Sequence, residues 1–594
     1  MGGIAGCIGR DGREATSALA RMLLSPHARG RSRRRATTGA LVVFGARDAD
    51  LAEDVERGES LALAGYVRRH GRACNAADLL AAWRHEGTGV LGSLSGEYCL
   101  AASVRGRVVV ARDAIGARPM YVAELRGGGV GFSTSMFALI LAGVGEELDH
   151  DTLVGSLVLG YPKSPGTALR SVRQVGPGEV WELAPRRSPR RWYAPREKLD
   201  AARSLSVAAR DVSRTLEHAV GDALVPGARV AAFLSGGLDS SIVLAQVHRS
   251  GAPVEAFTLF FGDTQPGEFR YSKAVAEHLG VRQNVLEVDA RSFCAGIERT
   301  MTHLEDVLSE AIAVPNFLLA REAARTTDVL FTGEGGDQAF GGTKNAGMFL
   351  AHPYASHPAS SSLPETYLVL HHNYWNDLPV ALAPDALAAF DPRRLLAAVR
   401  RTVGQRFPSR GTFLGRVMIA NTVLKGGNNI LVKAAKVIGA AHDLAVRSPM
   451  FDRRLVEHAL TIPPWQKMDG TEEKLVLRQA AYDCLPRWIV DRPKRGMSLP
   501  LAAWFAADLG VLSRDVLTER AVRERGLLRW DYVEKLLAQA PLGQDLVRPR
   551  TVEKLWLALV TELHLQAIDR VARDARVARA GAVSEVHPRE AAHG

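Results

Sequence analysis

Residues 235–241, Ser-Gly-Gly-Leu-Asp-Ser-Ser, combine hydroxyl side chains, two glycines and a carboxylate in one short stretch. An apolar run at 229–234 precedes them and a helical pattern follows, so the stretch joins the end of a strand to the start of a helix. Such a turn binds phosphate, because glycines permit close approach while free N–H groups and the helix dipole face the anion. Asp239 would repel phosphate, which predicts a cation between the two.

A second glycine-rich loop follows another apolar strand, within residues 326–342 (TTDVLFTGEGGDQAFGG). It places two carboxylates, Glu334 and Asp337, among glycines. The carboxyl ends of parallel strands lie at one edge of a sheet, so we expect Asp337 to lie near Asp239. Two carboxylates facing a triphosphate are oxygen ligands of the kind that Mg²⁺ prefers. The competing interpretation is a turn whose acids only cap backbone groups.

A third candidate lies in residues 487–500 (RWIVDRPKRGMSLP), where Arg492 and Lys494 stand in a loop with proline and glycine. A cation at a reacting phosphate stabilises the charge that builds on phosphorus and then on the carbonyl oxygen. Taken alone, this loop is typical of a solvated surface segment. Its occurrence together with the other two loops favours a catalytic role.

These loops need a scaffold of alternating strands and helices. Strand-like runs at 254–262 and 283–289 enclose a helical pattern at 268–280. The alternation predicts a doubly wound parallel sheet that binds ligands at the carboxyl ends of its strands. We place this α/β domain at 206–570, with a helical C-terminal part, after a charged, proline-containing linker at 191–205.

Residues 1–190 show a different pattern. Short strand-like runs such as 61–67 and 129–135 lie between glycine-rich turns, and two helical stretches accompany them, which predicts an α+β sandwich. The final residues, 571–594, are rich in alanine and arginine without an apolar stripe. We expect this tail to be disordered.

The composition is that of an ordinary globular chain. A length of 594 residues predicts two to four domains, and 47% hydrophobic with 23% charged residues fits a soluble protein. No apolar run reaches the roughly 18–20 residues of a membrane span, and the start lacks a signal-peptide pattern. We therefore expect a cytoplasmic protein without a membrane span. Five scattered cysteines without CxxC spacing argue against a disulfide framework or a zinc site.

The formal net charge of +11 favours anionic partners. The densest basic run, at 29–35 (RGRSRRR), is typical of a solvated loop, and no nucleic-acid-binding motif accompanies it. We expect no nucleic-acid partner, since ATP, pyrophosphate or an acidic peptide satisfies the same charge. The histidines between His352 and His372 match no compact metal site, and we interpret their segment as an inserted lid.

The loop at 235–241 lacks the G-x-x-x-x-G-K-S/T pattern of a Walker loop. It resembles the PP-loop of ATP pyrophosphatases, which bind ATP and adenylate a substrate. The run at 333–342 (GEGGDQAFGG) is similar to a loop of asparagine synthetases whose Asp binds magnesium. The same resemblance implies that Lys494 reaches the α-phosphate and the acyl-adenylate, and that ATP and Mg²⁺ are the cofactors. The predicted site residues are, for catalysis, Lys494, Asp239 and Asp337; for the cofactor, Ser235, Gly236, Gly237, Leu238, Asp239, Ser240, Ser241, Gly333, Glu334 and Gly335; and for the metal, Asp239 and Asp337.

The first domain, through its GIAG start and residues 94–121, resembles the glutaminase domain of class II amidotransferases of the asparagine synthetase type. In that family an N-terminal Cys is both nucleophile and its own base. This chain has Gly2 at that position, and Cys7 lies beyond the first strand, where we expect it to be buried. Ala64 replaces a glutamine-binding Asn, and Asn75 replaces an Asp. We therefore expect no glutamine hydrolysis, and a domain retained as a scaffold or a peptide-docking surface.

Further differences from the family motifs indicate which branch of the family this chain resembles. Asparagine synthetases carry E-x-R-x-P-F-L-D where this chain has residues 445–452, with Ala445 in place of Glu. β-Lactam synthetases use a Tyr–Glu dyad, and the matching positions hold Glu334 and Ala445. The remaining branch is the lasso peptide cyclase, which joins an Asp or Glu side chain of a peptide to that peptide's own α-amine. An α-amine has a pKa of about 7.7–8.0 and needs no strong base, and an intramolecular attack gains much from positioning.

The resemblance thus implies an AMP-forming amide ligase that closes a macrolactam in a ribosomally made precursor peptide. Family cyclases work beside a leader peptidase and a leader-binding protein, which are the further expected partners. One alternative is a glutamine-independent amide synthetase acting on a small molecule, and another is a catalytically silent nucleotide-binding paralogue. A tRNA-thiolating enzyme shares the PP-loop but would need a catalytic Cys pair or an RNA-binding module, and neither is seen.

Overall fold

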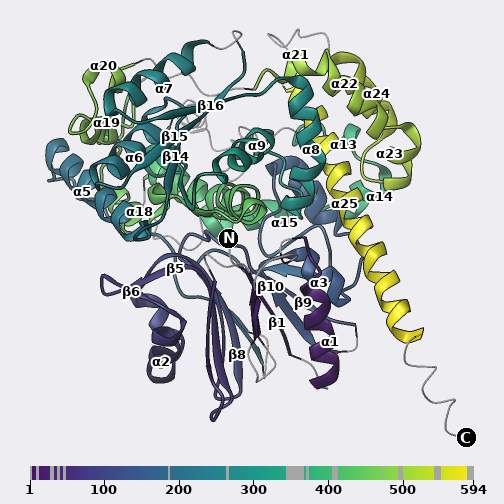
Figure 1. Cartoon of the computed structure of the whole chain (residues 1–594). Helices are drawn as coiled ribbons and strands as arrows, with labels where there is room; N and C mark the ends of the chain where they lie inside the picture. Colours follow the sequence, from purple (N-terminus) through teal and green to yellow (C-terminus); the bar gives the residue numbers. More distant parts are fainter. Residues whose placement is uncertain are drawn as a thin grey trace, which may run out of the picture.

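The structure, a computed structural model of the chain, has a β-rich N-terminal part below a larger part of mixed helices and strands (Figure 1). None of the described helices is both long and apolar enough to cross a membrane. The residues described are 3–8, 12–26, 28, 33–35, 41–44, 49–126, 128–184, 188–262, 266–342, 367–368, 374–403, 412–470, 472–492, 499–540 and 550–584.

The N-terminal part is a sandwich of antiparallel sheets packed face to face. One sheet has the order β11 (Val172–Gln174), β9 (Tyr121–Glu124), β10 (Val130–Ser133), β1 (Gly3–Ile8), β3 (Leu41–Phe44), β2 (Arg33–Arg35). The other has the order β13 (Ser188–Arg191), β12 (Glu179–Ala184), β8 (Arg107–Arg112), β7 (Leu94–Val104), β5 (Glu59–Arg69), β4 (Ala49–Asp54), with β6 (Arg72–Cys74) also paired to β5. Ile4 and Phe132 of the first sheet share a buried cluster with Ala64 and Val110 of the second.

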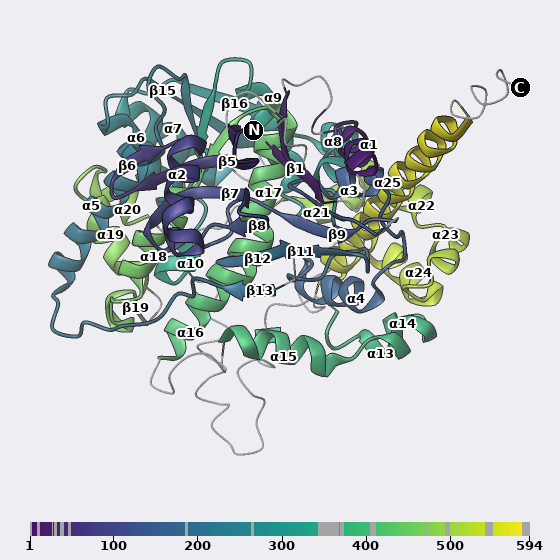
Figure 2. The ribbon, with the colours of Figure 1, turned by 90° about the horizontal axis from the view of Figure 1, so that it is seen from below.

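Helices cover the two outer faces of the sandwich. On the first sheet, α1 (Gly12–Met22), α3 (Met136–Ala142) and α4 (His150–Leu159) pack against side chains such as Ala5 and Tyr121. On the second, α2 (Ala76–Glu86), followed by the short helix η1 (Gly87–Ser93), packs against Leu63 and Leu100. Figure 2 shows α2 and α1 on opposite sides of the sheets. The predicted α+β sandwich is confirmed.

The second part is built on a parallel sheet. Its order is β16 (Gln283–Glu287), β15 (Val254–Phe260), β14 (Val230–Phe233), β17 (Val329–Phe331), β18 (Ala445–Arg447). The chain enters at β14, winds outward through β15 and β16, and then returns to add β17 and β18 on the other side of β14. The strand order therefore reverses between β14 and β17, the position where doubly wound sheets bind their ligands.

Helices bury both faces of this sheet, and α5 (Leu205–Ala223) leads into it after residues 192–204, which form neither helix nor strand. Alternate residues of β14 point to opposite faces: Val230 and Ala232 join one buried cluster, and Ala231 joins the other. Burial on both faces explains why the central strands β14 and β17 are apolar throughout. The crossover helices are α6 (Leu238–Arg249), α7 (Pro266–Leu279), α8 (Ala290–Leu304) and α9 (Ala313–Ala323). The predicted doubly wound sheet is confirmed.

The C-terminal part of this domain is mainly helical, as predicted. One long continuous helix is formed by α16 (Phe413–Ala420), the π-helical η3 (Asn421–Ile430), α17 (Leu431–Lys433) and the π-helical η4 (Ala434–Ala440). The other elements are α10 (Gly336–Phe340), α13 (Leu378–Ala381), α14 (Pro384–Ala389), α15 (Pro392–Val403), η5 (Pro449–Phe451), α18 (Arg453–Ala459), η6 (Pro464–Gln466), β19 (Met468–Asp469), β20 (Glu472–Glu473), α19 (Leu475–Ala481), α20 (Arg487–Val490), α21 (Leu501–Phe505), α22 (Asp508–Val516), α23 (Glu519–Arg525), α24 (Trp530–Gln539) and α25 (Thr551–Ser584).

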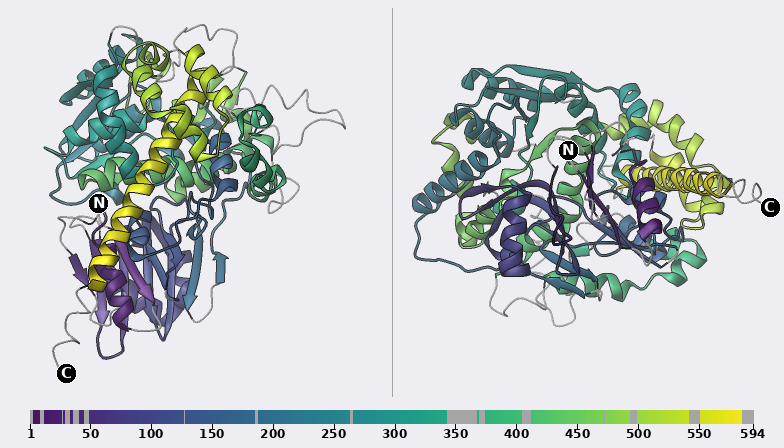
Figure 3. Two further views of the ribbon diagram at one scale, coloured as in Figure 1. Left: turned by 90° about the vertical axis from the view of Figure 1, so that its right-hand side faces the viewer. Right: turned by 60° about the horizontal axis from the view of Figure 1, so that its bottom comes forward.

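The final helix corrects one expectation. Disorder was expected for 571–594, but α25 continues to Ser584, and residues 585–594 lie outside the described part. The helix persists because small side chains, Ala572 and Ala575, are buried along it. Arg576 forms an ion pair with Glu146 of the N-terminal domain. Figure 3 shows α25 lying along both domains. Contacts with these domains therefore stabilise the helix, although its sequence has no apolar stripe.

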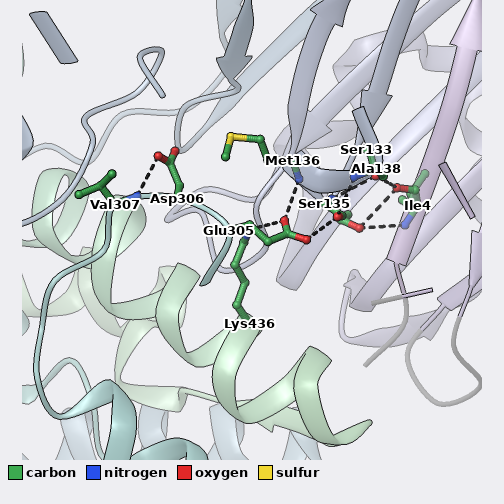
Figure 4. Close-up of polar contacts among 10 residues, drawn as sticks. Ile4, Ser133, Ser135, Met136, Ala138, Glu305, Asp306, Val307 and Lys436 are labelled. Atoms are coloured by element: carbon green, nitrogen blue, oxygen red, sulfur yellow. Dashed lines mark hydrogen bonds and ion pairs between the residues drawn. The ribbon is translucent and has the colours of Figure 1, made fainter. Parts of the chain in front are cut away.

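A buried polar network joins the domains, as Figure 4 shows. Glu305, just after α8, accepts hydrogen bonds from Ser135 Oγ and from the backbone N–H of Met136, the latter at 2.7 Å. Lys436 Nζ of the long helix lies 2.7 Å from Glu305 Oε2 and 4.8 Å from the centre of the Tyr121 ring. Burial lowers the pKa of Lys436, but Glu305 outweighs it and keeps the pKa above its ordinary value. The network therefore ties the sandwich to the second domain through the hydrogen bonds of Glu305 and the contact of Lys436 with Tyr121.

Candidate active site

The PP-loop lies between β14 and α6 at the point where the strand order reverses. Its hydroxyl groups hold it together: the Ser235 backbone N–H donates to Ser240 Oγ at 3.2 Å, and the Gly237 N–H donates to Ser235 Oγ at 3.2 Å. Gly236 has a φ of +77°, and a Cβ there would lie 2.6 Å from the Ser272 backbone nitrogen. Only glycine fits this left-handed, crowded position.

The second glycine-rich loop, which follows β17, lies directly against the PP-loop. A Cβ at Gly333 would lie 2.5 Å from Ser240 Cα, and a Cβ at Gly336 would overlap the carboxylate of Asp239. The two loops approach this closely because neither glycine has a side chain. This contact confirms the expectation that the two loops are neighbours.

Lys474 bridges the two aspartates. Its Nζ lies 2.6 Å from Asp239 Oδ2 and 2.6 Å from Asp337 Oδ1. Lys474 has a left-handed backbone (φ 54°) immediately before α19, which aims its side chain at both loops. Burial lowers the pKa of Lys474, but the two carboxylates outweigh it and hold the pKa above its ordinary value. The side chain is therefore a fixed cation between the two carboxylates.

These loops line one end of a cavity of about 650 Å³. Arg492 lies at the same end, with its guanidinium 4.5 Å from the centre of the Tyr271 ring and 3.7 Å from Glu268 Oε1. Burial lowers the pKa of Arg492. Arg478 of α19 also lines the cavity and forms an ion pair with Glu472 at 2.8 Å. Together with Lys474, these arginines make this end suitable for an anionic ligand.

A second set of charges also lines the cavity. Glu310 Oε2 forms an ion pair with Lys433 Nζ, and Glu310 Oε1 lies 3.4 Å from Lys425 Nζ. Both lysines belong to the long helix. Burial lowers the pKa of Lys433, but Glu310 and then Glu334 outweigh it and raise the pKa. Glu334 also lines the cavity. We refer to Glu310, Lys425 and Lys433 as the far-wall cluster.

The structure separates the predicted site residues into three groups. One group lines the cavity: Ser235, Gly237, Leu238, Asp239, Ser240, Gly333, Glu334, Gly335 and Asp337. A second group shapes the loop from behind: Gly236 packs against α7, and the Ser241 hydroxyl is buried and donates to the Gly237 carbonyl at 2.8 Å. The third, Lys494, lies outside the described residues, as do the histidines from His352 to His372.

The structure shows where the N-terminal residues lie that differ from the glutaminase pattern. Cys7 is buried, as expected, but it lies within β1 and not beyond it, because the strand continues to Ile8. Ala64 is buried between the sheets. Asn75 caps α2, accepting the backbone N–H of Asp78 at 2.9 Å and donating its own to that side chain at 3.0 Å. Its amide is therefore used in a capping box. Gly2 lies outside the described residues.

The two positions that match the β-lactam synthetase dyad have different surroundings. Glu334 lines the cavity, whereas Ala445 is buried at the start of β18, paired beside Val329. Arg447, which follows, stacks over Tyr66 of the N-terminal domain with its guanidinium carbon 4.7 Å from the ring centre. This stretch thus contributes to the domain interface.

Sequence reasoning missed Lys474 and the far-wall cluster. A weak signal existed for Lys474, because it opens the run KLVLRQA (474–480) just before the third motif. No sequence signal marked the far-wall cluster. Glu310 and the two lysines are more than a hundred residues apart, and only the packing of the long helix brings them together.

The residues present fit a magnesium ion. Mg²⁺ in nucleotide sites is held by one or two carboxylates together with phosphate oxygens, and Asp239 and Asp337 converge at the phosphate-binding loop. Within the described residues no group of three or more His, Cys, Asp or Glu side chains is placed to hold a metal ion. Asp239 and Asp337 would therefore hold the ion only together with a nucleotide.

Comparison with known proteins shows which family the chain resembles. The asparagine synthase family model matches residues 211–570, and a glutamine amidotransferase domain model matches residues 69–193. A Mycobacterium tuberculosis protein named "Putative asparagine synthetase (glutamine-hydrolyzing)" is 29% identical over 466 residues, covering 72% of this chain and 71% of that protein. Asparagine synthetase (glutamine-hydrolyzing) 1 of Bacillus subtilis is 23% identical, covering 77% of this chain and 76% of its own.

Among solved structures, the glutamine phosphoribosylpyrophosphate amidotransferase of B. subtilis is similar over 56% of this chain and 81% of its own, with 15% identity and a TM-score of 0.23. That score is too low to support an argument about this chain. The family model, in contrast, spans the parallel sheet, both glycine-rich loops and Lys474. This chain belongs to the asparagine synthase family.

Proposed function

We propose that this chain is an ATP-dependent amide ligase that adenylates an Asp or Glu side chain of a peptide and closes a macrolactam with the peptide's α-amine. The observation that carries the proposal is the convergence of Asp239 and Asp337 on Lys474 at one end of a 650 Å³ cavity. An anion-binding loop, paired carboxylates and a fixed ammonium are the groups that a phosphoryl-activating site requires.

The first step is attack of a carboxylate oxygen on the α-phosphorus of ATP. The new P–O bond forms as the bond to the β-phosphate oxygen breaks, and pyrophosphate leaves. The PP-loop N–H groups bind phosphate oxygens, and Lys474 and Arg492 stabilise charge on the departing pyrophosphate. Mg²⁺, held by Asp239 and Asp337 with the nucleotide, would neutralise further phosphate charge. By its family resemblance, Lys494 would contact the α-phosphate.

The second step is attack of an amine on the acyl carbon. A C–N bond forms, the bond from the acyl carbon to the AMP oxygen breaks, and one proton is released. No glutamine-derived ammonia is required in this scheme, because the positions of a glutaminase site hold Gly2, Ala64 and Asn75. An α-amine of the same peptide supplies the nucleophile, and holding both groups in one cavity favours attack.

A ribosomally made precursor peptide is the proposed partner, processed with a leader peptidase and a leader-binding protein. The test compares peptides from producing cells that contain the intact chain or its Asp239→Ala variant. Mass spectrometry should detect a peptide lighter than its linear sequence by one water and resistant to carboxypeptidase. This peptide should be present only with the intact chain, and the linear form should accumulate with the variant.

The alternatives give different results. If the purified chain forms AMP and pyrophosphate only with a small amino acid, it is a small-molecule amide synthetase. If neither the parent nor the variant forms AMP with any carboxylate, the chain is a silent nucleotide-binding protein and the proposal fails.

A further inference from the structure

We propose that Glu310 is a catalytic residue of the second step: it binds the attacking amine as an ammonium ion and accepts the proton whose loss makes that amine a nucleophile. This inference rests on the proposed function and adds an amine subsite to it. The site of the inference is the far-wall cluster, which lines the same cavity as the PP-loop.

Charges of both signs line the cavity. Lys474, Arg478 and Arg492 line it together with Asp239 and Asp337, and Glu310 and Glu334 line it beside Lys433. Carboxylates repel the phosphates of ATP and attract a cation. Ala311 and Ile312 beside Glu310 line the same wall, so an ammonium ion bound there would have an apolar chain beside it. Glu310 and Glu334 therefore offer carboxylates to an ammonium ion in this part of the cavity, beside apolar side chains.

The two oxygens of Glu310 have partners of different kinds. Oε2 pairs with Lys433, whose side chain is only 2% exposed. Oε1 lies 3.4 Å from Lys425 Nζ, a long contact, and the Lys425 side chain is 30% exposed. Lys425 can therefore withdraw into solvent while Lys433 stays. A substrate ammonium that takes the place of Lys425 leaves the net charge of the cluster unchanged.

The position of Glu310 is fixed by the N-terminal domain. Five residues earlier, Glu305 bonds to Ser135 and Met136 of the sandwich (Figure 4). Asp306 Oδ1 accepts the Ala168 backbone N–H at 3.1 Å. Ser309 donates from its backbone N–H and its Oγ to the Gly160 carbonyl, at 3.0 and 2.7 Å. The loop that carries Glu310 is thus attached to the sandwich on one side and lines the cavity on the other.

The proposed step is balanced as follows. The ammonium transfers one proton to Glu310 Oε1 and the resulting amine attacks the acyl carbon of the adenylate. The C–N bond forms, the acyl C–O bond to AMP breaks, and the nitrogen loses its second proton to solvent. Glu310 then returns its proton to solvent. No oxidant, reductant or further co-reactant is needed.

The test separates the two steps with Glu310→Gln. The probes are Mg-ATP, radiolabelled pyrophosphate, hydroxylamine and the linear peptide that accumulates in the Asp239→Ala cells. We expect ATP–pyrophosphate exchange within about threefold of the parent, and macrolactam formation lower by about 100-fold or more, the size of a lost general base. Hydroxylamine, which is uncharged at neutral pH, should trap the acyl-adenylate of the variant as readily as that of the parent.

Glu322→Gln is the matched control. Glu322 has the same 26% side-chain exposure as Glu310 and also pairs with a cation, Arg325, but it lies on α9 and does not line the cavity. It should keep both activities. If Glu310→Gln fails to fold, the double variant Glu310→Gln with Lys433→Met removes the unpaired buried charge and should show the same separation of steps.

The outcomes are distinct. Macrolactam formation by Glu310→Gln at the parental rate, with exchange intact, overturns the role of Glu310 and leaves the proposed function standing. An equal loss of ATP–pyrophosphate exchange, of hydroxylamine trapping and of macrolactam formation also overturns this role. Glu310 would then be needed for the adenylation step as well as for the attack of the amine. Absence of exchange in the parent overturns the proposed function and this inference with it.

Discussion

The two domains use polar residues in opposite ways at the positions where their family carries chemistry. In the sandwich, Asn75 is used by its own helix as a cap, and Ala64 is an apolar residue of the core. In the synthetase domain, Asp239 and Asp337 share Lys474 across two loops that lie together only because Gly333 and Gly336 lack side chains. Polar side chains that hydrogen-bond only to their sequence neighbours have a structural role. Polar side chains from distant segments that meet at a cavity indicate a functional site.

The domains nevertheless depend on each other. Arg112 of the sandwich donates to the Gly427 carbonyl of the long helix at 3.0 Å, and Lys436 further along that helix lies over the ring of Tyr121 of the sandwich. Lys433, one turn before Lys436, belongs to the far-wall cluster. The helix that lines the cavity is therefore held by the sandwich. We infer that the sandwich acts as a scaffold for the synthetase site.

The largest effect is expected from Lys474→Met. It leaves Asp239 and Asp337 facing each other without a cation, which should cost about 3–5 kcal/mol of stability. AMP formation should fall by at least about 100-fold, as for loss of one transition-state donor. Thermal unfolding and AMP release measure the two effects. Unchanged AMP formation would show that Lys474 has only a structural role.

A matched control for this variant is Lys273→Met. Lys273 pairs with Glu277 at 3.8 Å, and both side chains are exposed. The unfolding free energy should change by less than about 0.5 kcal/mol.

The next effect concerns the domain interface. Glu305→Gln leaves the buried Lys436 without a counter-charge and should destabilise the whole chain by about 3–5 kcal/mol. Denaturant unfolding followed by fluorescence measures it. Glu298→Gln, at an exposed pair with Arg570, should change stability by less than about 1 kcal/mol. Equal stability of the two variants would mean that the network does not hold the domains together.

A smaller effect on stability, but a specific one on activity, is expected from Gly336→Ala. The added methyl group overlaps the carboxylate of Asp239 and must displace it from Lys474. AMP formation should fall about 10-fold or more, since small misplacements at a reacting centre are costly. Gly221→Ala, in helix α5 with nothing near its added methyl group, should stabilise the chain by about 0.4–1 kcal/mol. Full activity of Gly336→Ala would contradict the assigned role of the loop contact.

The smallest effect is expected at Asn75. Asn75→Ala removes the helix cap and should cost about 1 kcal/mol, while macrolactam formation should not change. Adding glutamine should alter neither the parent nor the variant. Glutamate release from glutamine by the parent would show that the sandwich has kept a glutaminase site, and the comparison between the domains would fail.

Much of the fold could be predicted from local patterns. The strand before the PP-loop, the helix after it, and the strand at 254–260 follow from apolar runs bounded by glycine-containing turns. The contact between the two glycine-rich loops follows from the rule that parallel strands end at one edge. The helix at 571–584 was not predicted, because its stability comes from Ala572 and Ala575 packing against distant elements.

The candidate site was predicted only where its residues lie in glycine-rich motifs. Asp239 and Asp337 belong to such motifs, whereas Lys474 precedes an apolar helix and Glu310 lies in a loop with no recognisable pattern. Their importance arises from ion pairs across 235 and 123 residues of sequence. Local sequence carries no record of such pairs, so only the assembled sheet and long helix reveal them.

The measurement that tests the central claim most directly follows an oxygen atom. The linear peptide, labelled with ¹⁸O in its side-chain carboxylate, is incubated with the purified chain and Mg-ATP. Adenylation places one carboxylate oxygen on phosphorus, so the released AMP should carry one ¹⁸O atom and Asp239→Ala should release none. Unlabelled AMP, or formation of ADP and phosphate in its place, would contradict activation of a carboxylate as an acyl-adenylate at this site.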